Sequence, residues 1–143
     1  MEIRKLTQKD LNDLIKLYTE LTDFENDISK TRPVFEKMLN DKQYYLLGAW
    51  DNDRLAGSVL GIICDSAVAS GRPFMVVEDV IVSEEYRRKG VGLLLFEKLD
   101  EIALKNDCLY SILVSGAARK GAHVFYDKVG YTDEVRGFRK KYF

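Results

Sequence analysis

The sequence has few of the residues that build metal centres and disulfide frameworks. It contains two cysteines and one histidine among 143 residues. Zinc and iron sites usually draw on several His or Cys ligands, so we expect no metal site. Cys64 and Cys108 both lie in apolar, strand-like surroundings, where a buried free thiol is more common than a disulfide.

Long apolar runs and an excess of charge of one sign are also missing. No stretch reaches the ~18 apolar residues of a membrane-spanning helix, and no secretory signal is visible. The net charge of −1 argues against a basic nucleic-acid surface. Hydrophobic residues make up 46% of the chain, enough for one core at this length. We therefore expect a single domain over residues 1–143, cytoplasmic, with neither a membrane nor a nucleic acid as partner.

Hydrophobic periodicity predicts helices and strands along the whole chain. Thr7 with Asp10 resembles a capping box that opens a first helix, and Thr31 with Pro33 indicates the start of a second. Further helices are expected over 91–105 and 118–129, and strands over 2–6, 43–50, 54–64, 74–82 and 108–114. A hairpin of 131–135 and 138–142 around Gly137 is expected to close the sheet. This order predicts a mixed α/β fold with helices on both faces of the sheet.

Residues 76–92 carry the strongest functional signal. An apolar strand runs into a basic turn with two glycines, and the turn runs into a helix near Val91. Backbone N–H groups at a helix N-terminus bind anions such as phosphate, and Gly90 and Gly92 would let the backbone approach such a ligand. An ordinary junction with a solvated basic face is the alternative reading. Leu93 and Leu95 stand where a Walker loop or a dinucleotide fingerprint needs other residues, which disfavours ATP hydrolysis and hydride transfer.

Two motifs resemble those of the GNAT N-acetyltransferase superfamily. Residues 87–92, Arg-Arg-Lys-Gly-Val-Gly, resemble its Arg/Gln-x-x-Gly-x-Gly/Ala motif, and residues 122–131 resemble its Ala-x-x-Phe-Tyr-x-x-x-Gly-Phe/Tyr segment. The region around Arg119 and Tyr126 is similar to short acetyltransferases of small amines, such as those acting on aminoalkylphosphonates. The resemblance implies a mostly antiparallel mixed sheet that splays between its fourth and fifth strands. It also implies acetyl-CoA as cosubstrate and an amine as acceptor.

The resemblance further implies where acetyl-CoA binds. Its pyrophosphate would lie on the amides of Arg88 to Leu93, and its pantetheine arm would pair with the strand at 80–82. An N–H of Ile81 or Val82 could polarise the thioester carbonyl. Arg119 stands where many family members have a cofactor-contacting Asn. The implied cofactor-binding residues are Val80, Ile81, Val82, Arg87, Arg88, Lys89, Gly90, Val91, Gly92, Leu93, Arg119, Ala122, Phe125 and Tyr126.

Tyr126 and Glu78 are the candidate catalytic residues. Tyr126 would act as general acid toward the leaving thiolate, and Glu78 as general base, through water, for the ammonium of the acceptor. A packed core tyrosine and a structural ion pair are the alternatives. Strand alternation would place Asp79 on the opposite face from Glu78, and His123 would be a solvated helix residue. For acceptor recognition the candidates are Tyr18, Phe24, Glu25 and Arg72.

The expected function is acetyl-CoA-dependent N-acetylation of a primary amine of a small molecule. Acetylation of a protein N-terminus or lysine is an alternative within the same class. A non-catalytic acyl-CoA-binding module is the alternative from another class. The family resemblance also implies a homodimer, in which the tail from Gly137 to Phe143 could pair across the interface.

Overall fold

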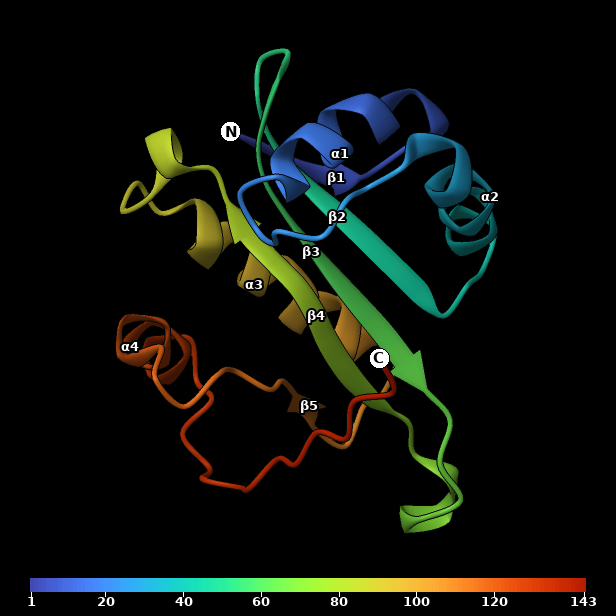
Figure 1. The fold of residues 1–143 in the computed structure, drawn as a ribbon. Coiled ribbons are helices and arrows are strands. Elements are labelled where there is room, and N and C mark those ends of the chain that lie inside the picture. The colour runs from blue at the N-terminus through green and yellow to red at the C-terminus, as the bar shows by residue number, and fades with distance from the viewer.

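The computed structural model describes residues 1–143, and a five-stranded sheet in the order β1-β2-β3-β4-β5 forms its centre (Figure 1). The first four strands are antiparallel to one another, and β5 runs parallel to β4. Their bounds are β1 Glu2–Lys5, β2 Tyr44–Asp51, β3 Arg54–Cys64, β4 Phe74–Val82 and β5 Ser111–Ile112. The prediction of a mixed, mostly antiparallel sheet is confirmed.

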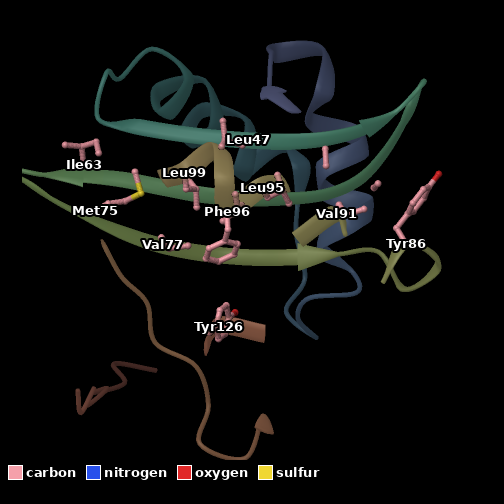
Figure 2. Packing of buried hydrophobic residues seen from close by; sticks show 13 residues of the cluster. Leu47, Ile63, Met75, Val77, Tyr86, Val91, Leu95, Phe96, Leu99 and Tyr126 are labelled. Atoms are coloured by element: carbon pink, nitrogen blue, oxygen red, sulfur yellow. The ribbon is translucent and has the colours of Figure 1, made fainter. Parts of the chain in front are cut away.

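Helices cover both faces of this sheet and divide the interior into two cores. The helices α1, Leu11–Tyr18, and α2, Ile28–Leu39, pack on one face through a cluster that includes Leu14, Phe35 and Leu60. On the other face lies α3, Val91–Lys105, with α4, Lys120–Lys128, beside it. Figure 2 shows side chains of α3 against β4, with Tyr126 of α4 next to Phe96. None of the helices combines the length and apolar character needed to cross a membrane.

The fourth strand, β4, contains a β-bulge. Ser58 of β3 pairs with Ile81 and Leu60 pairs with Glu78, so one residue of β3 faces two of β4. Asp79 lies at this irregularity with φ of 51°. Before the bulge, the odd-numbered residues Met75 and Val77 pack on the α3 side. After it, the even-numbered residues Val80 and Val82 do so, because the extra residue shifts the alternation by one position. The expectation that alternation places Glu78 and Asp79 on opposite faces is therefore wrong.

The start of α2 also differs from the prediction. Asp27 is its N-cap, and Asp27 Oδ1 accepts a hydrogen bond from Ser29 N–H at 2.9 Å. Pro33 consequently lies inside the helix rather than at its first turn. The capping box at Thr7 and Asp10 is present, and it opens a short 3-10 helix, Gln8–Asp10, ahead of α1.

The C-terminal region departs furthest from the prediction. β5 has two residues instead of the seven expected over 108–114, and no strand forms between Tyr131 and Phe143. The expected hairpin around Gly137 is thus wrong. Phe138 and Tyr142 have the even spacing of side chains on one face of a strand, yet both are exposed. Alternation alone produces no strand where no neighbouring strand offers hydrogen bonds.

Candidate active site

The turn between β4 and α3 presents a row of free backbone donors. Gly90 is the N-cap of α3 with φ of 82°, and Arg88 also adopts a left-handed conformation. The N–H groups of the six residues from Arg88 to Leu93 donate no hydrogen bond within the chain, whereas Leu94 N–H bonds to Gly90 O at 3.2 Å. Unpaired amides at the positive end of a helix dipole are suited to an anion.

The two glycines of the turn have different structural roles. A Cβ at Gly90 would meet nothing within 4 Å, so the left-handed backbone is what favours glycine there. A Cβ at Gly92 would lie 2.9 Å from Cζ of Phe125. Gly92 therefore makes room for a ring of α4, which brings α4 against the first turn of α3.

The basic side chains of the turn are exposed and form no ion pair. Arg87 Nε donates to Val82 O at 3.2 Å, which folds this side chain back along β4. Lys89 Nζ lies 5.5 Å from the centre of the Tyr86 ring. Arg88 has no such contact, so its guanidinium is available to an anion on the neighbouring amides.

The second half of β4 has an open edge. β5 pairs only with Met75 and Val76, so no strand flanks this side of β4 from Val77 onward. Ser83 N–H bonds to Ala56 O of the β3 side at 2.9 Å. Because N–H directions alternate along a strand, Val80 and Val82 point toward the open edge and Ile81 points toward β3. Of the two expected oxyanion donors, Val82 fits this geometry and Ile81 does not.

Tyr126 lies in the aromatic cluster between α3 and α4. Its side chain is 9% exposed, and its ring centre is 5.9 Å from that of Phe96. The phenol makes no hydrogen bond within the chain. Burial raises the pKa of Tyr126, and the nearby charge of Arg119 offsets part of that rise. The hydroxyl is therefore neutral and free to donate a hydrogen bond, while the ring packs in the core.

Two carboxylates without a partner lie at the bulge. Neither Glu78 nor Asp79 forms a hydrogen bond or an ion pair through its side chain. Burial raises the pKa of both, and the charge of Asp79 raises that of Glu78 further. Tyr18 of α1 has a raised pKa, first from its own burial and then from Asp79. Asp79 thus lies close to α1, and Glu78 pairs with Leu60, which belongs to the core on the α1 side. Both residues are exposed to solvent.

The start of α4 holds the remaining candidates. His123 Nε2 donates to Gly116 O at 2.9 Å and so fastens the loop that precedes the helix. Arg119 is the exposed N-cap of α4, and its side chain packs over Gly116. Ala122 is half-buried and packs, with Phe125, against the α3 core. Arg119 lies near enough to Tyr126 to affect its pKa.

The expected acceptor residues are only partly brought together. Tyr18 lies near the carboxylate of Asp79 in β4. Phe24 contacts Phe143 at the end of the tail, edge to face, with ring centres 5.6 Å apart. Arg72 instead holds the loop before β5 through Asp107. Glu25 is exposed and forms no ion pair.

The residues that hold the turn had no distinctive signal in the sequence. Tyr86 OH donates to Asp51 Oδ2 at 2.9 Å, and Glu20 accepts two hydrogen bonds at the end of β4. Each of these partners is distant in sequence, and acidic residues at helix ends and hairpin turns are common. Only the folded chain shows that they meet.

Known proteins resemble this chain in sequence and in fold. A model of the acetyltransferase (GNAT) family matches residues 10–131. A glucosamine 6-phosphate N-acetyltransferase from Trypanosoma brucei brucei is 30% identical over 86 residues, which are 60% of this chain and 56% of that protein. The aligned region thus spans little more than half of the relative's length.

Solved structures agree over nearly the whole chain. An acetyltransferase from Trypanosoma brucei has a TM-score of 0.86 at 25% identity, with 98% of both chains covered. A glucosamine-6-phosphate N-acetyltransferase from Arabidopsis thaliana has a TM-score of 0.88 at 22% identity, covering 99% of this chain and 97% of that one. The similarity of fold therefore extends beyond the region that matches in sequence.

Proposed function

The chain belongs to the GNAT family of acetyltransferases, and on this premise we propose that it moves the acetyl group of acetyl-CoA to a primary amine of a small molecule. One observation carries the proposal. The open edge of β4 leads directly into the row of free amides from Arg88 to Leu93. An extended arm that ends in a pyrophosphate suits a strand edge followed by an anion site.

The residues present fit acetyl-CoA at this place. The free amides and the unpaired guanidinium of Arg88 would hold the pyrophosphate, and the open space at Gly90 leaves room for it. Val80 and Val82 would hydrogen-bond the pantetheine arm. Arg119 would supply a further positive charge at the start of α4. When bound, acetyl-CoA supplies an acetyl group on a thioester, which an amine can attack directly.

Two side chains would move the protons of this transfer. Glu78 would take a proton from the acceptor's ammonium through water, because only the neutral amine is a nucleophile. A C–N bond forms and the C–S bond breaks, while Val82 N–H would stabilise the charge on the carbonyl oxygen. Tyr126 would protonate the leaving sulfur, and the raised pKa of its phenol keeps that proton in place at neutral pH. The nitrogen would release its second proton to solvent water, and solvent would return a proton to Tyr126 after the transfer.

The acceptor side favours a small cationic molecule. Glu78 and Asp79 have no cationic partner in the chain, and an ammonium group would supply one. The relative from Trypanosoma brucei brucei is described as acting on glucosamine 6-phosphate, which supports amino sugars as the first acceptors to screen. Acetylation of a protein N-terminus or lysine, and acyl-CoA binding without catalysis, are the competing functions.

We further propose that residues 1–143 act as one domain and that the protein forms a homodimer through its tail. Val135, Phe138, Tyr142 and Phe143 are each at least 65% exposed. Apolar side chains gathered on one exposed segment are typical of an interface. A second copy of the chain could cover them.

Calorimetric titration with acetyl-CoA tests the donor, and Tyr126→Phe tests the chemistry. We expect micromolar binding to the wild type and to Tyr126→Phe, because phenylalanine keeps the packed ring and the hydroxyl makes no hydrogen bond within the chain. The variant should lose roughly 10²-fold or more in kcat, the usual effect of removing a general acid. Unchanged turnover would exclude Tyr126 as the acid, and no binding by the folded wild type would contradict the transferase proposal.

A further inference from the structure

A residue near the N-terminus, Glu20, holds the start of the anion-binding turn. Glu20 lies two residues beyond α1, and both oxygens of its carboxylate are used. Oε1 accepts from Ser83 Oγ at 3.0 Å, and Oε2 accepts from Glu84 N–H at 2.8 Å. Ser83 is 7% exposed and directly follows β4. A single carboxylate thus fixes the point at which the chain leaves the sheet.

Only a few contacts orient the turn. After the 3-10 helix, Glu84–Tyr86, the six amides from Arg88 to Leu93 have no hydrogen bond within the chain. Their direction depends on how the preceding residues are held. Tyr86 bonds to Asp51, Glu85 pairs with Arg54, and Glu20 holds the entry. Of these three side-chain contacts, only that of Glu20 comes from outside the β2–β3 hairpin.

The charge of Glu20 is unfavourable for the proposed ligand. Glu84 and Glu85 already lie in this turn, and a further carboxylate repels a pyrophosphate. Electrostatics alone would therefore make a neutral residue at position 20 better for binding. A carboxylate is useful here because it offers one acceptor oxygen to each of two donors, whereas an amide has a single oxygen and alanine has none.

We propose that Glu20 is a positioning residue for acetyl-CoA, aligning the amides of the turn by holding Ser83 and Glu84. This inference rests on the proposed function, since it names what the turn binds. It predicts a change in binding opposite to the one that electrostatics alone would give. Removing a negative charge beside an anion site weakens anion binding here, because the lost alignment outweighs the relieved repulsion.

The test compares Glu20→Gln and Glu20→Ala with the wild type. Glutamine keeps one acceptor and alanine keeps none, so the Kd for acetyl-CoA should rise about threefold and about tenfold respectively. The KM for acetyl-CoA should rise in parallel, with a smaller change in kcat. Asp23→Asn is the matched control, because Asp23 is an exposed acid close to Glu20 in the sequence that forms no ion pair, and its Kd should stay at the wild-type value.

Ser83→Ala provides a second, independent variant. It removes one of the two donors and should weaken binding less than Glu20→Ala does. Combining the two substitutions should add little to Glu20→Ala alone, since both remove the same contact. If Glu20→Ala fails to fold, Glu20→Gln and Ser83→Ala decide the outcome.

Amide hydrogen exchange of Glu84, Tyr86 and Arg87, whose N–H groups are hydrogen-bonded in the free protein, separates the two proposals. Faster exchange in Glu20→Ala would show that Glu20 holds the turn, whatever the turn binds. Equal or tighter acetyl-CoA binding by a folded Glu20→Ala variant would overturn the positioning role. Failure of the wild type to bind acetyl-CoA would instead overturn the proposed function.

Discussion

At the scale of single residues, the contact of Gly92 with Phe125 gives a direct prediction for stability. Gly92→Ala places a methyl group 2.9 Å from Phe125 Cζ, and overpacking of this kind costs about 1–3 kcal/mol. Phe125→Leu in the same chain should restore part of the loss. Gly90→Ala is the matched control. It should cost about 1 kcal/mol through its left-handed backbone, and Phe125→Leu should not rescue it. Urea unfolding of the wild type and of Gly92→Ala and Gly90→Ala, each with and without Phe125→Leu, measures these free energies.

Asp79 gives a prediction about pH. Its pKa is raised in the folded chain by burial, so the proton binds more tightly to the folded state than to the unfolded one. The stability that this provides is complete below the unfolded pKa and is lost as pH rises through the folded pKa. At pH 7 the ionised carboxylate is therefore destabilising. Asp79→Asn should raise Tm slightly at pH 7, by about 1–3 °C.

The pH series distinguishes this effect from a general gain in packing. The difference in Tm between Asp79→Asn and wild type should shrink as pH falls toward about 4, where the wild-type carboxyl also becomes neutral. Asp23→Asn, an exposed loop substitution, should leave Tm unchanged at both pH values. A gain in Tm that persists at low pH would contradict the electrostatic explanation.

At the scale of secondary-structure elements, the open edge of β4 predicts a pattern of hydrogen exchange. The N–H groups of Val80 and Val82 point away from β3 and should exchange quickly in the free protein. Acetyl-CoA should slow them, together with Arg88 to Leu93, if its arm pairs with the strand. The N–H of Ile81 faces β3 and should be slow in both states. Protection of the turn without protection of Val80 and Val82 would place the arm elsewhere.

The elements also show what the sequence could predict. The bounds of β3, β4 and α3 agree with the expected 54–64, 74–82 and 91–105, because periodicity and the turn residues at both ends are local signals. The bulge at Asp79 depends on the register of two strands, and no pattern within β4 indicates it. The tail has the alternation of a strand but no neighbour to pair with, and pairing is a property of the fold.

The candidate site divides in the same way. The turn from Arg88 to Leu93 could be located from its glycines and basic residues, because neighbouring residues in the sequence determine where a helix starts. The packing of Gly92 on Phe125 could not be predicted, because it depends on how α3 and α4 meet. The shared face of Glu78 and Asp79 could not be predicted either, because it depends on the register between β3 and β4.

At the scale of the whole molecule, the exposed tail predicts self-association. Sedimentation equilibrium should show a dimer, and replacing Phe138 and Phe143 with serine should shift it toward the monomer. Leu104→Ser is the matched control, because Leu104 is 81% exposed on α3 and far along the chain from the tail. It should leave the dimer intact. A monomer at high protein concentration would rule out the tail as a dimer interface.

The open stretch of β4 beyond Val76 also bears on how the protein behaves during purification. A strand edge with free N–H and C=O groups accepts any extended chain, so it is a starting point for aggregation. In the proposed complex the pantetheine arm would occupy that edge and the pyrophosphate would cap its end. We expect protein prepared without coenzyme A to scatter more light on storage than protein kept with it. The ligand would then preserve colloidal stability by occupying the place of a missing strand.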